Sequence, residues 1–220
     1  MIKENLPTCT FTNERVIFRS HLNEFTHDLF EEFDLNAKTI GLHSKIDDLF
    51  NAKEVNFTEA LAAWHPKYRA EYDPNELDTA SHKGQQKELL DFYDLCKNAK
   101  NIVTIGIGGS FEGPKMFLEN IDLNNVNTNC IFITGSDLYE FVTKTNNLKP
   151  EDTVFLVSSK SFTTQETLFF LKEAISWSGD INKFVAITAN KKEAKKYNIK
   201  CIIEFDHEIG GRYSIWSEIS

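Results

Sequence analysis

The 220-residue sequence lacks the features that mark redox and metal proteins. Its four cysteines form no C-x-x-C pair, and free thiols in a reducing compartment are their simplest interpretation. No cluster of His, Cys and Asp residues has metal-ligand spacing, so we expect no bound metal. The cysteines are Cys9, Cys96, Cys130 and Cys201.

Long apolar runs are also absent. The first 18 residues, MIKENLPTCTFTNERVIF, have no continuous apolar core of the kind found in signal peptides, and no later stretch has the length of a membrane span. The net charge of −9 is unlike that of general nucleic-acid binders, which are usually basic. We therefore expect a cytoplasmic protein with no membrane or nucleic-acid partner. An acidic chain can still bind a phosphate through local N–H groups, hydroxyls and a few cations.

What the second half of the sequence does contain is a regular alternation of apolar runs and helical patterns. Because this alternation is typical of a parallel sheet covered on both faces by helices, we expect an α/β fold with a five-stranded parallel sheet. The predicted strands are 102–107, 130–134, 153–157, 184–188 and 201–205. The predicted helices between them are 114–120, 137–145, 164–176 and 191–197.

The first part of the chain has a different pattern. Helical spacing of apolar residues occurs over 23–33, 45–50 and 56–65, and an amphipathic helix is predicted over 87–100. We therefore divide the chain into an N-terminal helical segment, 1–85, and a sheet domain, 86–220.

A glycine-rich turn, Gly106–Ser110, follows the first predicted strand. Ligands of parallel α/β sheets bind at the carboxyl ends of the strands, and glycines let the backbone approach a ligand closely. The turn does not fit G-x-G-x-x-G, because Phe111 stands where the last glycine is required. It does not fit a P-loop either, because Pro114 stands where lysine is required. We expect neither a dinucleotide nor a nucleoside triphosphate, and no other cofactor.

The turn after the third predicted strand, residues 158–164 with the sequence SSKSFTT, is richer in chemistry. It places five hydroxyls and one ammonium at the start of a predicted helix, and these groups with backbone N–H groups suit a phosphate. A hydroxyl-rich cap that only satisfies the helix N–H groups explains the composition equally well. The first glycine turn on a neighbouring strand end favours the phosphate site.

A third turn contains Gly210, Gly211 and Arg212. An arginine stays charged and can stabilise a developing oxyanion. A solvated arginine in a surface turn is the alternative.

Taken together, three segments resemble successive signatures of the glucose-6-phosphate isomerase family. They are IGIGGSxxGP at 105–114, SKSFTTQET at 159–167 and GGRYSIWS at 210–217. The resemblance covers roughly residues 45–220. It implies a sugar isomerase (SIS) fold, a three-layer sandwich. It also implies reversible isomerisation of glucose 6-phosphate and fructose 6-phosphate through a cis-enediol, without a cofactor.

The resemblance also implies roles for individual residues. Gly109 would let the backbone approach the substrate, and Arg212 would lie near C1 and C2 and stabilise the enediolate. Glu112, Leu61 and Glu218 depart from the family's pattern and indicate a divergent member. Five residues would hold the sugar phosphate: Ser110, Ser159, Lys160, Ser161 and Thr164.

The family's glutamate base, its ring-opening histidine and its second sheet domain belong to later motifs that these 220 residues do not contain. We therefore expect the chain to be the N-terminal part of the enzyme and inactive alone. By the same resemblance, the full-length protein would be a homodimer. The alternative is an SIS-domain sensor that binds a sugar phosphate without catalysis.

Overall fold

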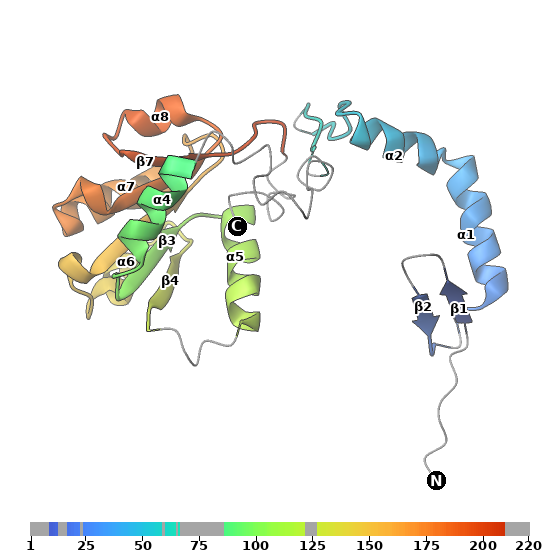
Figure 1. The fold of residues 1–220 in the computed structure, drawn as a ribbon, viewed down its shortest axis with the longest axis horizontal. Coiled ribbons are helices and arrows are strands. Elements are labelled where there is room, and N and C mark those ends of the chain that lie inside the picture. The colour runs from blue at the N-terminus through green and yellow to red at the C-terminus, as the bar shows by residue number, and fades with distance from the viewer. Residues whose placement is uncertain are drawn as a thin grey trace, which may run out of the picture. The chain divides into compact units, whose positions relative to one another are not determined.

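A computed structural model of the chain describes two compact units, residues 1–51 and 52–220, which are considered separately (Figure 1). The boundary predicted near residue 85 falls outside the described residues and stays a prediction. The described residues are 9–12, 17–22, 24–58, 60–64, 66, 86–121 and 127–209.

The first unit contains a β-hairpin followed by two helices. Strands β1 (Cys9–Thr12) and β2 (Ile17–Ser20) pair antiparallel. Helix α1 (His27–Thr39) begins where the Thr26 hydroxyl accepts the Leu29 N–H at 3.3 Å. A left-handed glycine, Gly41, separates α1 from α2 (Leu42–Phe50).

The hairpin was not predicted, because strands of four residues are too short to show a clear period. Contacts between elements support it instead. The ring of Phe18 on β2 lies 5.7 Å from that of Phe30 on α1, edge to face, and Phe25 lies beside both.

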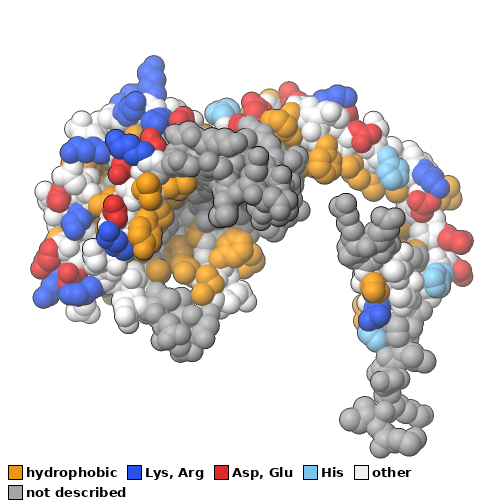
Figure 2. Space-filling view, in the orientation of Figure 1, with side chains coloured by type: hydrophobic (Ala, Val, Ile, Leu, Met, Phe, Trp, Pro, Cys, Tyr) orange, Lys and Arg blue, Asp and Glu red, His pale blue; other side chains and the backbone are white. Residues whose placement is uncertain are grey.

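Apolar side chains remain exposed on both helices of this unit (Figure 2). No residue of α1 or α2 is buried. The aromatic cluster around Phe30 is therefore only partly shielded from solvent. Exposed apolar residues of the two helices are Phe33, Leu35, Leu42, Ile46 and Phe50.

The second unit contains the predicted five-stranded parallel sheet flanked by helices (Figure 1). The strand order is β4-β3-β5-β6-β7. The strands are β3 (Asn101–Ile105), β4 (Asn129–Ile133), β5 (Thr153–Ser158), β6 (Phe184–Thr188) and β7 (Cys201–Glu204). The helices are α4 (Gln86–Cys96), α5 (Gly109–Asn120), α6 (Leu138–Thr145), α7 (Gln165–Ser178) and α8 (Lys191–Lys195). Two short 3₁₀ helices, Pro150–Asp152 and Ile181–Lys183, precede β5 and β6.

Alternate residues of the central strand β5 face opposite sides of the sheet, as a strand requires. Phe155 packs in a cluster that includes Phe170 of α7 and Phe141 of α6. Val154 packs in a second cluster, against which Phe92 of α4 lies. Both faces of the sheet are therefore covered, which explains why the strands are continuously apolar.

The strand order puts a reversal between β3 and β5. From β3 the chain crosses to β4 on one side, and it then returns to β5 on the other side of β3. Such a reversal is a topological switch point, and it opens a crevice at the carboxyl ends of the two strands. The turns at 106–110 and 158–164 lie at these two ends.

The helix predicted over 56–65 is wrong for the residues that the structure describes there. Asn56 and Leu61 form an isolated antiparallel bridge, and Ala60 and Ala63 have left-handed backbones with φ of 52° and 49°. The N–H of Trp64 donates to the Glu208 carbonyl at 3.0 Å. Local spacing favoured a helix, but hydrogen bonds to a distant loop decided the conformation.

Candidate functional site

Gly106 joins the two turns at the switch point. Ile105, the last residue of β3, pairs with Val157 of β5. A Cβ on Gly106 would lie 2.9 Å from the Cβ of Ser110 and 3.1 Å from the Ser158 carbonyl oxygen. Because real Cβ atoms do not approach this closely, only glycine lets the first turn pack against the end of β5.

Gly108 starts helix α5. Its φ of 59° lies in the region that favours glycine. Its carbonyl accepts the N–H groups of Phe111 and Glu112 at 2.9 and 2.8 Å. Gly109 and Ser110 therefore form the first turn of α5, five residues earlier than predicted, and the Ser110 side chain is buried. The glycines around Ser110 have low helix propensity, which is why the sequence pattern missed this first turn.

In the second loop, residues 158–164, the side chain of Phe162 points into the core. The residue has a left-handed backbone with φ of 52°, and only 1% of its surface is exposed. Its ring lies 6.0 Å from that of Tyr197, and its N–H donates to Ser159 Oγ at 3.2 Å. Burying Phe162 leaves its neighbours Ser161 and Thr163 exposed to solvent.

The hydroxyls of this loop interact with one another. Ser159 Oγ and Thr164 Oγ1 lie 3.2 Å apart, and Thr163 Oγ1 donates to Ser161 Oγ at 2.7 Å. Thr164 is the N-cap residue of α7, yet no side chain caps this helix. Of the alternative that we considered, the side-chain cap of α7 is not formed, although the hydroxyls of Ser159 and Ser161 do accept N–H groups within the loop.

The end of β6 holds the backbone of Lys160. The Lys160 carbonyl accepts the Ala189 N–H at 3.1 Å and the Thr188 hydroxyl at 3.0 Å. Ser159 N–H donates to the Ile187 carbonyl at 3.1 Å. These hydrogen bonds fix the backbone of Lys160. Its side chain extends from this fixed backbone, and the residue is partly exposed.

The structure thus gathers most of the predicted site residues at the carboxyl ends of β3 and β5. Arg212, with Gly210 and Gly211, lies outside the described residues, and its role stays a prediction. Thr188 and Tyr197 were missed, because nothing in their local sequence indicates contact with residues 160–162. The gathered residues are Gly109, Ser110, Ser159, Lys160, Ser161 and Thr164.

The sequence of this chain matches the family model "Phosphoglucose isomerase" over residues 19–220. The chain belongs to the phosphoglucose isomerase family. The match begins earlier than the resemblance near residue 45, and it includes both described turns of the site.

Curated relatives agree with this membership. Glucose-6-phosphate isomerase of Neurospora crassa is 31% identical, over 93% of this chain and 42% of its own length. The Shewanella sediminis enzyme of the same name is 35% identical, over 83% of this chain and 38% of its own. The chain therefore spans about two fifths of the length of these relatives.

A solved structure supports the fold. The crystal structure of a glucose-6-phosphate isomerase from Chlamydia trachomatis matches with a TM-score of 0.76 and 19% identity, and covers 96% of this chain and 44% of that one. At this level of identity the likeness concerns the fold alone, here that of a phosphoglucose isomerase.

In this member of the phosphoglucose isomerase family, the turn after β4 differs from the turns at 106–110 and 158–164, because a carboxylate of the chain accepts its N–H groups. Glu140 of α6 accepts the N–H groups of Gly135 and Thr134 at 2.9 and 3.4 Å and the Lys144 ammonium at 2.6 Å. Burial alone raises the pKa of Glu140, but these hydrogen bonds outweigh it and hold the pKa below its usual value. The acceptor that these N–H groups need is thus supplied internally.

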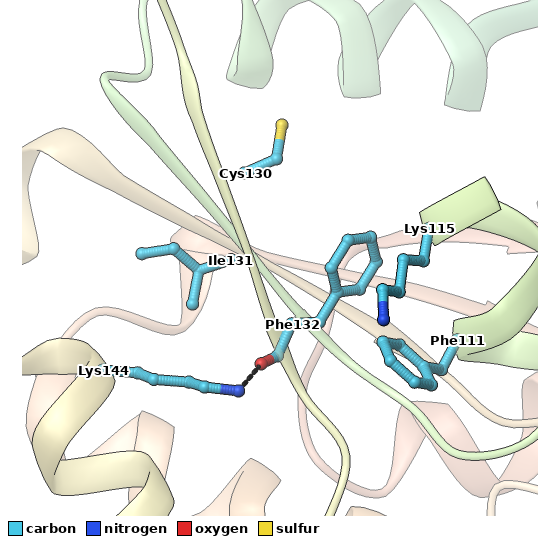
Figure 3. A pocket seen from close by; sticks show the side chains of 6 residues that line it. All are labelled: Phe111, Lys115, Cys130, Ile131, Phe132 and Lys144. Carbon is cyan, nitrogen blue, oxygen red and sulfur yellow. Dashed lines mark hydrogen bonds between the residues drawn. The ribbon is translucent and has the colours of Figure 1, made fainter. Parts of the chain in front are cut away.

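A cavity of about 390 Å³ lies along β4 (Figure 3). The Phe111 and Phe132 rings meet edge to face at 5.4 Å, and Lys144 donates to the Phe132 carbonyl at 2.6 Å. Burial raises the pKa of the Cys130 thiol in this cavity. None of the predicted site residues lines it.

Two further observations concern only the described part of the chain. No group of three His, Cys, Asp or Glu residues there is placed to hold a metal ion. No helix there has both the length and the apolar character that crossing a membrane requires.

Proposed function

We propose that this chain supplies the sugar-phosphate site of an enzyme that interconverts glucose 6-phosphate and fructose 6-phosphate through a cis-enediol. Membership of the phosphoglucose isomerase family supports this reaction. The observation that carries the proposal is the uncapped start of α7 beside the paired Ser159 and Thr164 hydroxyls.

The phosphate would bind at this helix start. The free N–H groups and the positive end of the helix dipole, equivalent to roughly half an elementary charge, favour an anion there. The hydroxyls of Ser159, Ser161 and Thr164 can each donate a hydrogen bond to a phosphate oxygen. Lys160 would add a full positive charge, since its ammonium is a compact donor on a flexible stem.

The sugar would extend toward the turn that follows β3. Gly109 and Ser110 begin α5 there, and Gly106 keeps that turn against the end of β5. Arg212 would stabilise the negative charge of the enediolate, since a guanidinium stays protonated. Proton transfer between C1 and C2 also needs a general base within hydrogen-bond reach, and we assign that role to no residue of this chain.

A binding experiment tests the phosphate site. Titration calorimetry of the 220-residue chain should show binding of glucose 6-phosphate and fructose 6-phosphate, weaker binding of inorganic phosphate and none of glucose. Equal affinity for glucose and glucose 6-phosphate would contradict the phosphate site, as would no binding of either sugar phosphate.

An activity assay tests the reaction. We expect no isomerisation by this chain alone, because the relatives are more than twice as long. A longer form that contains these residues should interconvert glucose 6-phosphate and fructose 6-phosphate. Loss of this activity on substituting Arg212 would support the proposed isomerase. Sugar-phosphate binding without interconversion in such a form would favour the sensor.

The homodimer, the cytoplasmic location and the lack of nucleic-acid or membrane partners also stay proposals, which sedimentation and cell fractionation can examine.

A further inference from the structure

Thr188, the last residue of β6, connects the loop 158–164 to the segment that follows β6. It is completely buried, with 0% of its surface exposed. Its hydroxyl donates to the Lys160 carbonyl at 3.0 Å and accepts the N–H of Asn190 at 3.0 Å. One side-chain oxygen thus satisfies a backbone acceptor in the loop and a backbone donor just before α8.

The segment that follows β6 contacts the same loop a second time, at a residue beyond helix α8. Asn190 caps α8 by accepting the Glu193 N–H at 3.3 Å. After the helix, the Tyr197 ring packs edge to face on Phe162. The segment from Thr188 to Tyr197 therefore holds the loop at Lys160 and again two residues later at Phe162.

We infer that Thr188 is a positioning residue for the sugar phosphate and acts through Lys160. This inference rests on the proposed function, because it supposes that Lys160 meets the phosphate. Thr188 is too deeply buried to touch the ligand itself. Its hydroxyl fixes the peptide from which the lysine stem extends. Fixing that peptide before binding lowers the ordering cost of placing the ammonium, and the Coulomb attraction then acts at a constant distance.

Thr188→Val tests the role of the hydroxyl, because valine has nearly the same shape and cannot donate a hydrogen bond. The Lys160 carbonyl would lose the Thr188 hydroxyl and retain the Ala189 N–H, and the Asn190 N–H would lose the hydroxyl as its acceptor. We expect the affinity of the 220-residue chain for glucose 6-phosphate to fall about fivefold to tenfold. Thr188→Ser retains the hydroxyl and should bind within about twofold of the original chain.

Thr153 offers a matched control at the opposite end of the neighbouring strand β5. It is also completely buried, its hydroxyl donates to the Lys149 carbonyl at 2.8 Å, and that hydroxyl accepts from Asn101 Nδ2 at 3.4 Å. Thr153→Val should lower the thermal midpoint about as much as Thr188→Val does, but leave glucose 6-phosphate binding unchanged.

The outcomes separate this inference from the proposed function. If the original chain binds no sugar phosphate, the proposed function fails, and the inference fails with it. If the original chain binds but Thr188→Val binds equally well, only the inference is overturned. Equal losses of affinity in Thr188→Val and Thr153→Val would also overturn it, because they would reflect general destabilisation. Should the valine variant not fold, Thr188→Cys, whose S–H is a weak donor, provides the same comparison.

Discussion

The hydroxyls of Ser159 and Thr164 lie 3.2 Å apart, and Thr164 uses its oxygen for this contact instead of capping the helix that follows it. An N-cap threonine normally accepts an N–H from the first turn of its own helix. Here the first turn of α7 keeps its donors for another acceptor, next to two hydroxyls and Lys160. This relationship is the basis of the proposed phosphate site.

Ser159→Ala should weaken binding of glucose 6-phosphate about tenfold, because a hydrogen bond to a charged phosphate is stronger than one between neutral groups. Calorimetry on the 220-residue chain measures the effect. Ser178→Ala is the matched control at the other end of α7, where the serine hydroxyl donates to the Asp180 carbonyl at 3.4 Å. An unchanged affinity in Ser159→Ala would exclude this hydroxyl from the phosphate site.

Phe162→Ala should destabilise the fold by about 3–5 kcal/mol, because it removes a fully buried ring and leaves a cavity beside Tyr197. Alanine would also keep the unfavourable left-handed backbone. Chemical denaturation measures the change. Phe169→Ala, at a ring that is 40% exposed on α7, should cost clearly less. Similar losses at both positions would contradict the anchoring role of Phe162.

Gly106→Ala should lower both stability and sugar-phosphate affinity, because the new Cβ would push the Ser110 turn away from the end of β5. We expect a cost of about 1–3 kcal/mol, typical of overpacking. Gly179→Ala is the control, since Gly179 has a left-handed backbone, with φ of 67°, and nothing within 4 Å of the added Cβ. It should cost about 1–2 kcal/mol in backbone strain but leave binding unchanged. Normal binding by Gly106→Ala would show that the two turns need not touch.

Glu140→Gln should destabilise the chain at neutral pH by about 1–3 kcal/mol, because it removes the charged acceptor of the Gly135 and Thr134 N–H groups. The pKa of Glu140 is lower in the folded state than its usual value of 4.5. The carboxylate therefore contributes stability above about pH 4.5, and this contribution is lost as pH falls through the lower folded-state pKa.

Denaturation curves at a series of pH values measure this dependence. The difference between the original chain and Glu140→Gln should shrink steadily in the acid range. Glu119→Gln is the control, because the Glu119 side chain is 65% exposed and the Lys115 ammonium lies 3.8 Å from its carboxylate, which is long for an ion pair. It should change stability little at any pH. If the difference in unfolding free energy between the original chain and Glu140→Gln does not vary with pH, the ionised carboxylate is not the source of the lost stability.

Local sequence was enough to predict the strands of the sheet domain. All five apolar runs overlap the observed strands, and 184–188 coincides with β6. This is possible because a buried parallel strand needs a continuous apolar run, which is visible over a few residues. The turns at 106–110 and 158–164 were found for a similar reason, since glycine and hydroxyl composition are also local.

The errors involve interactions that the local apolar pattern does not show. The segment 56–65 had helical spacing, but its residues pair across a bridge and with Glu208. The short strands of the hairpin are supported by contact with α1. Helix α5 starts earlier than its propensity predicts, because Gly108 and the packing of Gly106 place its first turn.

The amino-acid pattern alone specified an α/β sheet domain with phosphate-type turns after its strands, because propensity, apolar periodicity and turn composition act over short distances. We expected the first and third predicted strands to be neighbours, and the pairing of β3 with β5 confirms this, but the pattern itself does not fix strand order, which depends on the direction of each crossover. Nor did it indicate that Phe162 turns inward or that Thr188 holds Lys160. Those features arise from long-range packing and hydrogen bonds, and they order the loop that we propose binds the phosphate.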